Sequence, residues 1–255
     1  MIRFEDVTFG YDDQVVLDGV SFHIPLGESR VIMGPSGSGK STILRLVLGL
    51  ECPWAGTIHV DGHNICGMKP GRLRELRKQI AMVFQDGALF DSMTVGENVG
   101  YYLFEYSRKP EAEIEGEVRQ MLQFVDLDPD IVDKLPEELS GGMRRRVAVA
   151  RALLSTQPKI MLFDEPTTGL DPQATENVLD LIIKLQEIKK ISVIIVTHQI
   201  ADALKVTDKF IVIHEGHVVF DGDLEQLRGN GNLQLNNFLA PFKNSILEVV
   251  NKRFI

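Results

Sequence analysis

The chain has 255 residues, of which 44% are hydrophobic and 25% are charged, and this composition suits one globular domain with an apolar core. Its formal net charge of -9 argues against a general nucleic-acid-binding surface, because a phosphate backbone requires clustered Lys and Arg. No stretch reaches the roughly 18 consecutive apolar residues of a membrane-spanning helix, so partners would have to supply any membrane span.

Two cysteines, Cys52 and Cys66, form no C-x-x-C pair, and the acidic start MIRFED does not read as a secretory signal. Both features indicate a reducing compartment. His59 and His63 lie between the cysteines, which leaves a metal site as an alternative. The segment AGTIHVDG alternates as a strand that ends in a turn does, and this favours a strand without metal.

The predicted strands fall into two classes. Residues 2–11, 15–24 and 56–62 alternate with a period of two between turn signals, which predicts an antiparallel β layer. The runs SRVIMG, KIMLFDE and ISVIIVTH are apolar without alternation, as buried parallel strands are. We therefore expect an α/β fold with a mainly parallel central sheet and a separate antiparallel β subdomain.

A strand-poor stretch separates IAMVFQ from KIMLFDE. It contains three helical patterns, at residues 93–107, 111–127 and 140–154, and predicts an inserted α-helical subdomain at 92–155. The core with its β subdomain then comprises 1–91 and 156–228. Within the second of these ranges we expect a helix from Pro172, a strand, a short helix at 201–206 and a hairpin at 210–222. In the tail, 229–255, a short amphipathic helix is indicated by Ile246, Leu247, Val249, Val250 and Phe254.

The first chemical motif is GPSGSGKS, Gly34–Ser41, which satisfies G-x-x-x-x-G-K-[ST] between a predicted strand and a predicted helix. Glycines let the backbone fold around phosphates so that N–H groups and a helix N-terminus face the anion. Lys40 adds a positive charge, and the Ser41 hydroxyl can ligate magnesium. This context favours a phosphate cradle over an ordinary glycine-rich turn.

The second motif is KIMLFDEP, in which a buried strand ends at Asp164 and Glu165. Ligands gather at the carboxyl ends of parallel strands. Asp164 is suited to hold magnesium, and Glu165 can orient or deprotonate the water that attacks a γ-phosphate. Alone, such a pair is more often a helix cap or a solvated turn, but the upstream cradle favours the catalytic interpretation.

Five motifs in this order carry a resemblance: GPSGSGKST, FQDGALF, ELSGGMRRRVAVARALL, LFDEPTTGLDP and VTHQ. Over nearly the whole chain the sequence resembles the nucleotide-binding domain of ABC transporters. The resemblance implies one ABC ATPase domain over 1–255, a P-loop NTPase (RecA-like) core, ATP hydrolysis, and ATP and Mg2+ as ligands. DNA-linked ABC-type ATPases are an alternative, which the acidic balance disfavours.

The resemblance also implies roles for individual residues. Ser140, Gly141 and Gly142 match the signature loop that caps the γ-phosphate held by a second copy of the chain, and a helix start with a serine and glycines does suit an anion. Gln85 matches the Q-loop glutamine near magnesium and the attacking water, and His198 matches the switch histidine. Asp171 matches the D-loop aspartate that communicates across the dimer.

Further binding residues follow from the same match. Tyr11 matches the aromatic residue that stacks on adenine, with Phe9 as the alternative. The remaining cradle residues are expected to offer backbone or hydroxyl contacts to the phosphates, and magnesium is expected at Ser41, Gln85 and Asp164. These cradle residues are Pro35, Ser36, Gly37, Ser38, Gly39 and Thr42.

One departure from the usual LSGGQ signature is Met143, which replaces an amide with a thioether. With FQDGALFDSMTVGENV, it makes the chain similar to the ATPases of MCE-domain (Mla-type) phospholipid transporters. That resemblance implies two permease subunits, a periplasmic MCE-domain protein, and a peripheral location on the cytoplasmic face of the bacterial inner membrane. Transport of another substrate, such as an amino acid, metal or drug, is the alternative.

Two surface segments complete the predictions. The segment Asp86–Asn98 is a candidate docking surface for a permease, with Leu89, Phe90 and Met93 as exposed apolar anchors, and a packed loop is the alternative. The run Arg144–Arg146 invites a nucleic-acid or lipid-headgroup interpretation. Successive helix positions point in three directions, so a solvated face is favoured.

Overall fold

The computed structural model describes residues 1–229, 235, 239 and 240 of the chain. The amphipathic helix expected in the tail, around Ile246 to Phe254, lies outside the described residues. The chain divides into two compact units, each of which is taken by itself. Unit 1 comprises Met1–Arg77 with the described residues from Ser192 onward, and unit 2 comprises Lys78–Ile191.

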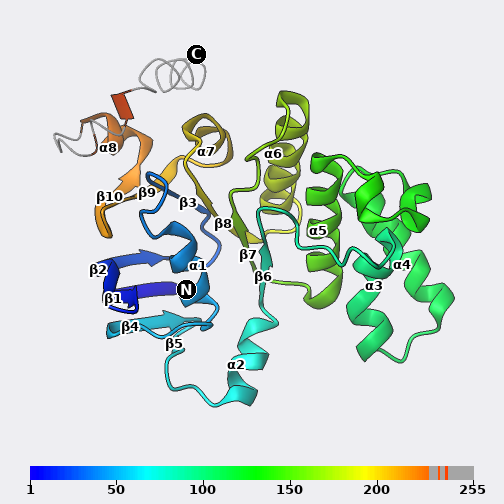
Figure 1. Ribbon diagram of the computed structural model, residues 1–255, viewed down its shortest axis with the longest axis horizontal. Coiled ribbons are helices and arrows are strands. Elements are labelled where there is room, and N and C mark those ends of the chain that lie inside the picture. Colours follow the sequence, from blue (N-terminus) through cyan, green and yellow to red (C-terminus); the bar gives the residue numbers. More distant parts are fainter. Residues whose placement is uncertain (230–234, 236–238, 241–255) are drawn as a thin grey trace. The chain divides into compact units, whose positions relative to one another are not determined.

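Unit 1 contains an antiparallel sheet with the spatial order β2-β1-β4-β5 (Figure 1), formed by β1 (Ile2–Tyr11), β2 (Gln14–Ile24), β4 (Ala55–Val60) and β5 (His63–Asn64). Buried and exposed residues alternate along much of β1 and β2, because one face of the sheet packs against the core. On the buried face, the rings of Phe4 and Phe22 stack with their centroids 4.5 Å apart. The predicted antiparallel layer is confirmed.

The other strands of unit 1 are β3 (Arg30–Met33), β8 (Ser192–Thr197), β9 (Lys209–His214) and β10 (His217–Asp223). Strand β3 is parallel to both β8 and β9, and β10 pairs antiparallel with β9 as the predicted hairpin. All six residues of β8 are buried. Burial on both faces explains why this run is apolar without alternation.

The helices of unit 1 are α1 (Lys40–Val47), α2 (Pro70–Arg77), α7 (Ile200–Val206) and α8 (Leu224–Gly229). Helix α2 buries only Leu76, and its weak apolar pattern explains why the sequence gave no helical signal there. The guanidinium of Arg77 donates to the carbonyls of Leu48 and Gly49, each at 2.8 Å, and so ties α2 to the end of α1.

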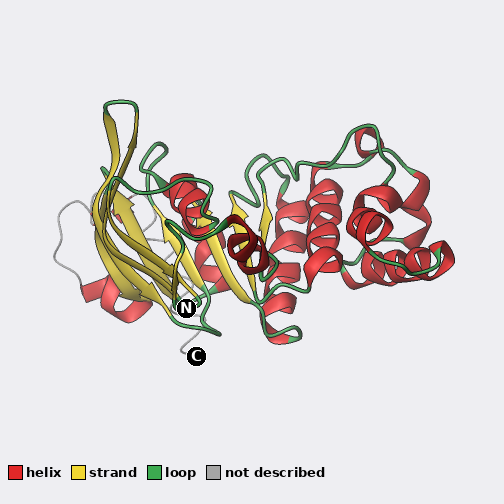
Figure 2. Ribbon diagram, turned by 90° about the horizontal axis from the view of Figure 1, so that it is seen from below, coloured by secondary structure: helices red, strands yellow, loops and turns green. Residues whose placement is uncertain are grey.

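Unit 2 contains the parallel strands β6 (Ile80–Val83) and β7 (Ile160–Asp164). Helix α5 (Gly141–Thr156) packs against α3 (Val95–Tyr106), α4 (Glu111–Phe124) and α6 (Pro172–Glu187), and two short 3-10 helices cover Pro129–Asp133 and Pro136–Glu138. The three helices predicted within 92–155 are present. Figure 2 shows that strands dominate unit 1 and helices dominate unit 2. Among the described residues, no helix has both the length and the apolarity needed to cross a bilayer.

Asn98 organises the loop between β6 and α3. Its side chain is fully buried and accepts a hydrogen bond from the Phe90 N–H at 2.8 Å. Its amide nitrogen donates to the carbonyls of Phe90, Met93 and Thr94 at 3.0–3.1 Å. Since one amide satisfies several backbone groups, the loop is held in a single conformation at the start of α3.

We expect Asn98→Ala to lower the free energy of unfolding by about 1–3 kcal/mol, because it removes the partner of two part-buried backbone groups, the Phe90 N–H and the Met93 carbonyl. Urea unfolding measures the change. The matched control is Asn177→Ala on α6, whose side chain accepts only one exposed bond, from Gln173, and which should stay within about 0.5 kcal/mol of the parent. Equal effects of the two changes would contradict this role for Asn98.

Candidate active site

The glycine-rich loop of unit 1 joins β3 to α1 as the sequence predicts. Gly39, just before the helix, has a φ of 97°, and a Cβ there would lie 2.6 Å from the Leu17 side chain. Only glycine fits this conformation and this close approach. The loop therefore brings the backbone of Gly34 to Gly39 to the N-terminus of α1, which is the arrangement that binds phosphate.

Two side chains indicate that this loop fits an anion. The ammonium group of Lys40 is buried and donates to the carbonyls of Gly34 at 3.0 Å and Pro35 at 2.9 Å, so it lies over the loop. The Ser38 hydroxyl is buried and has no hydrogen-bond partner within the described part of the chain. A buried polar atom without a partner in a cationic loop fits a phosphate ligand.

The other candidates of unit 1 lie at Tyr11 and His198. Tyr11 ends β1 with 38% of its surface exposed, whereas Phe9 is buried, so Tyr11 has the ring available for a base. The Tyr11 hydroxyl accepts a hydrogen bond from Arg45 of α1 at 3.3 Å. His198 is exposed and directly follows β8, where Thr197 is aligned with Met33 of β3. His198 and the glycine-rich loop thus follow the ends of neighbouring strands.

In unit 2, the acidic pair and Gln85 follow neighbouring parallel strands. Val83 of β6 is aligned with Phe163 of β7, so Gln85 and Asp164 lie at the same edge. Glu165 has a φ of 47°, which is unusual for a residue with a side chain. The Thr168 hydroxyl donates to its carboxylate at 3.1 Å. The ends of these two strands present two carboxylates and an amide, the groups needed for metal binding and for proton transfer from water.

The signature segment and Asp171 also meet within unit 2. Ser140 is the N-cap of α5 and accepts from the Met143 N–H at 3.3 Å, while Asp171 is the N-cap of α6 and accepts from the Ala174 N–H at 2.9 Å. A Cβ added to Gly142 would lie 2.8 Å from the Ala174 Cβ, so a glycine is needed for the two helix starts to approach. Gly141 likewise lies beside Leu170.

The arginine run corrects one prediction. None of Arg144, Arg145 and Arg146 is exposed, so the expected solvated face is wrong. They do point in three directions, because each donates to a different backbone segment: Arg144 to the Leu139 carbonyl and Arg146 to that of Asp126, both at 2.6 Å. Backbone carbonyl acceptors thus satisfy donors of these guanidinium groups, and an anionic ligand is not needed.

Arg145 is a candidate positioning residue that the sequence did not reveal. Its guanidinium is buried and donates to the carbonyls of Pro166 and Thr168, both at 3.1 Å, in the loop that follows β7. It also lies 4.0 Å from the carboxylate of Asp86, next to Gln85. Burial lowers the pKa of Arg145, and Asp86 acts in the opposite direction. One side chain therefore connects the signature helix with both candidate loops.

The segment Asp86–Asn98 combines both expectations, since it is packed against its surroundings and yet exposes one apolar anchor. Leu89 and Met93 are half-buried, whereas Phe90 is 43% exposed. The Phe90 ring packs against Tyr101 with centroids 5.1 Å apart, and the guanidinium of Arg151 lies 5.5 Å from its centre. A hollow of about 410 Å³ is lined by Phe90, Tyr101 and Arg151 and by Phe84. The segment is thus a packed loop that exposes an aromatic ring.

The alternative metal site between the cysteines is not supported. Within the described residues, no three His, Cys, Asp or Glu side chains gather closely enough to hold a metal ion. Burial raises the pKa of the Cys66 thiol to about 12, with a further contribution from a hydrogen bond with Cys52. Cys66 is therefore a protonated thiol at neutral pH.

Comparison with known proteins decides the family. The model of the ABC transporter family matches residues 17–168, more than half of the chain. The chain belongs to the ABC transporter family. This ABC ATPase binds and hydrolyses ATP, as the motifs of both units predicted.

The names of the relatives of this ABC ATPase refer either to lipids or to methionine import. The intermembrane phospholipid transport system ATP-binding protein MlaF of Haemophilus influenzae is 37% identical over 239 residues, 94% of this chain and 90% of the relative. The methionine import ATP-binding protein MetN of Caulobacter vibrioides is 38% identical over 229 residues, 89% of this chain and 68% of the relative. The chloroplastic protein trigalactosyldiacylglycerol 3 of Arabidopsis thaliana is 37% identical over 254 residues, 93% of this chain and 73% of the relative.

Solved structures confirm the fold class. The dimeric ATP-binding cassette MJ0796 bound to ADP and Pi has a TM-score of 0.79 at 33% identity, covering 88% of this chain and 98% of that one. CbiO1 from Clostridium perfringens has a TM-score of 0.80 at 29% identity, covering 98% of each chain. The ABC ATPase thus has the ABC cassette fold: a P-loop core, an antiparallel β subdomain and a helical subdomain.

We expect Arg145→Gln to lower kcat for ATP hydrolysis by about tenfold or more with little change in KM, because the loop carrying Glu165 loses two charge-assisted hydrogen bonds. Steady-state kinetics measures the change. Arg119→Gln makes the same charge change on α4, where the side chain donates to the Pro129 carbonyl at 3.1 Å, so it should largely preserve kcat. An equal fall of kcat in both variants would contradict the positioning role of Arg145.

Proposed function

We propose that this ABC ATPase energises phospholipid transport through a complex with permease subunits and an MCE-domain protein. The observation that carries the proposal is the signature LSGGM, in which Met143 replaces the usual glutamine, together with FQDGALFDSMTVGENV after β6. Two relatives, MlaF and trigalactosyldiacylglycerol 3, carry lipid names and each match at least 93% of the chain. Such a complex would lie at the bacterial inner membrane, with this subunit on the cytoplasmic face.

In this proposal, unit 1 binds the nucleotide. The backbone of Gly34, Gly37 and Gly39, with the hydroxyl groups of the loop, contacts the phosphates, and Lys40 neutralises part of their charge. The ring of Tyr11 stacks on adenine, and its exposure supports this role. The orphaned hydroxyl of Ser38 supports the phosphate position. His198 contacts the γ-phosphate.

Unit 2 supplies the residues of the hydrolytic step. Glu165 orients the attacking water and accepts its proton, and the bond from Thr168 holds the carboxylate in place. Gln85 and Asp164 of unit 2, and Ser41 of unit 1, carry oxygen atoms of the kind that Mg2+ prefers as ligands, and the ion would neutralise phosphate charge. The family membership supports the joint action of these residues on one ATP.

A second copy of the chain completes the proposed site. Ser140, Gly141 and Gly142 present a helix N-terminus, which suits the γ-phosphate of a nucleotide held by the opposite copy. Asp171 caps the adjacent helix, so its position is coupled to that of the signature loop. The structure of MJ0796 is described as dimeric with ADP and Pi, which supports this arrangement for a related cassette.

The permease is proposed to dock on Asp86–Asn98. An exposed aromatic ring beside a hollow is a common anchor site for an inserted side chain. Phe90 meets this description, and Asn98 holds the loop rigid beneath it. Because Asp86 also faces Arg145, movement of this loop would reach the loop that carries Glu165.

A second candidate function is methionine import, which the MetN relatives at 38–40% identity favour. The nucleotide chemistry would be the same, since the substrate is selected by other subunits. A DNA-linked role is disfavoured by the net charge of -9.

Copurification separates the two candidates. Tagged protein is isolated from its native membrane in detergent, and its companions and bound lipids are identified by mass spectrometry. We expect a permease, an MCE-domain protein and phospholipid. A permease accompanied by an amino-acid-binding protein would overturn the lipid assignment while leaving the ATPase assignment intact.

We expect Glu165→Gln to preserve ATP binding and to lower turnover by about 10²-fold or more, because the amide removes the proton acceptor and leaves the phosphate cradle intact. Phosphate release and nucleotide binding are measured on the same preparation. Lys40→Ala should instead weaken ATP binding. The control Glu187→Gln, at the exposed end of α6, should retain parental turnover. Near-parental hydrolysis by Glu165→Gln would rule out Glu165 as the base.

A further inference from the structure

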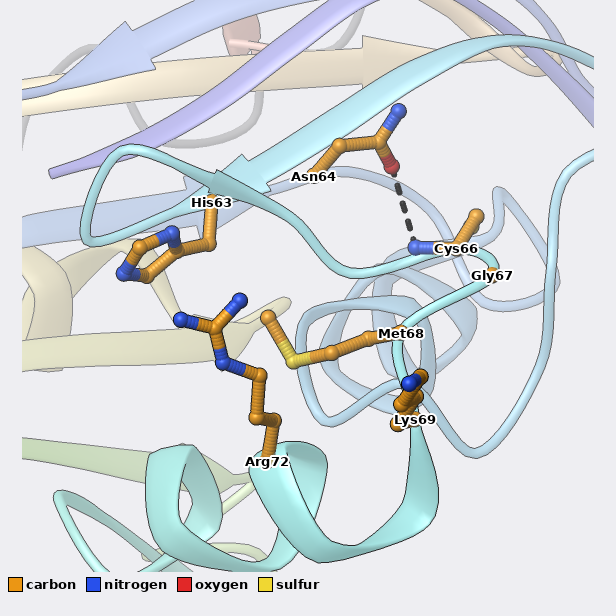
Figure 3. Close-up of a pocket in the computed structure, with 7 residues that line it drawn as sticks. All are labelled: His63, Asn64, Cys66, Gly67, Met68, Lys69 and Arg72. Atoms are coloured by element: carbon orange, nitrogen blue, oxygen red, sulfur yellow. Dashed lines mark hydrogen bonds between the residues drawn. The ribbon is translucent and has the colours of Figure 1, made fainter.

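A hollow of about 460 Å³ lies between β5 and α2 in unit 1 (Figure 3). It is lined by His63 and Asn64, by the segment from Cys66 to Lys69 and by Arg72 of α2, without any residue of the glycine-rich loop. It is therefore distinct from the nucleotide-binding residues of this unit.

The charge of this hollow is opposite to that of the chain. Lys69 and Arg72 are exposed cations, His63 adds an imidazole, and none of the lining residues is acidic. Within the described part of the chain, these three side chains form no ion pair and no hydrogen bond. In a chain of net charge -9, two unpaired cations around one concave site are selective for an anion.

The side chains of Arg72, His63 and Met68 lie together at the hollow, and Lys69 lines it as well (Figure 3). Figure 3 shows the guanidinium of Arg72 directed toward the imidazole of His63, with the Met68 side chain beside them. Lys69 directly precedes α2, and its carbonyl accepts from the Leu73 N–H at 3.0 Å. The cationic groups therefore border one space.

The walls of the hollow are fixed. The Asn64 side chain accepts from the Cys66 N–H at 3.0 Å, and the Ile65 N–H donates to the Ile58 carbonyl at 3.0 Å. Arg77 ties the other end of α2 to Leu48 and Gly49. A concave site with a fixed backbone loses little entropy when a ligand binds.

We propose that this hollow binds a phosphate group, with Arg72 and Lys69 as its cationic ligands and His63 as a further hydrogen-bonding group. Arginine suits phosphate because its planar fork donates two parallel hydrogen bonds, and lysine adds a mobile point charge. The phosphate belongs either to a soluble phosphate monoester or to an anionic lipid headgroup. The site does not depend on the transport substrate proposed above.

Methyl NMR of methionine-labelled full-length protein tests the proposal. The Met68 methyl group reports on the hollow, and the Met33 methyl group, at the end of β3, reports on the glycine-rich loop. The probes are glycerol 3-phosphate, vesicles of phosphatidylglycerol in phosphatidylcholine, and vesicles of phosphatidylcholine alone. We expect a saturable change of the Met68 signal with the anionic probes, independent of any change at Met33.

The variant Lys69→Gln/Arg72→Gln should weaken this binding by about tenfold or more. Arg74→Gln, an exposed cation of the same helix outside the hollow, is the matched control and should bind as the parent does. Since the replaced side chains are exposed, thermal unfolding should be unchanged, which checks that the variants fold.

The outcomes are distinct. A Met68 response to glycerol 3-phosphate supports a soluble phosphate ligand, and a response only to phosphatidylglycerol vesicles supports a headgroup ligand. No Met68 response to either anionic probe overturns the proposal. An equal loss of binding in Arg74→Gln and in the double variant also overturns it, because binding would then reflect a general basic surface.

Discussion

Burial of the parallel strands on both faces restricts polar chemistry to the points where these strands end. All six residues of β8 and the last three of β3 are buried, so the first available groups are His198 and the loop from Gly34. The same holds in unit 2, where Gln85 and Asp164 follow or end the aligned strands β6 and β7. The strand register therefore determines which candidate residues of each unit lie together.

A buried arginine shows how the loop after β7 is held. Removing a guanidinium from water is costly unless its donors are satisfied, and Arg145 satisfies its donors with two carbonyls and a nearby carboxylate. The same bonds fix the backbone on which Glu165 adopts a positive φ. A less constrained loop would allow Glu165 to relax, since that conformation is unfavourable for a residue with a Cβ.

Periodicity predicted the strands other than β5 and the helices α3, α4 and α5, because each of these helices buries several residues. It gave no signal for α2, which buries a single leucine and is held by bonds from Arg77 to distant carbonyls. Helical periodicity also predicted a solvated Arg145, whereas the side chain is buried, because its carbonyl acceptors lie about 20 residues away in the chain. Motifs locate functional groups, but tertiary hydrogen bonds that bury a charge have no local sequence pattern.

Met143 illustrates how a signature can change without loss of its local structure. The cap of α5 is a bond from the Met143 backbone N–H to the Ser140 hydroxyl, so it is independent of the side chain at position 143. Gly142 sets the approach to α6 through its lack of a Cβ, which is likewise independent of that side chain. The exchange of an amide for a thioether therefore leaves the helix N-terminus formed, and its effect is confined to contacts that a side chain at this position makes with nucleotide or partner.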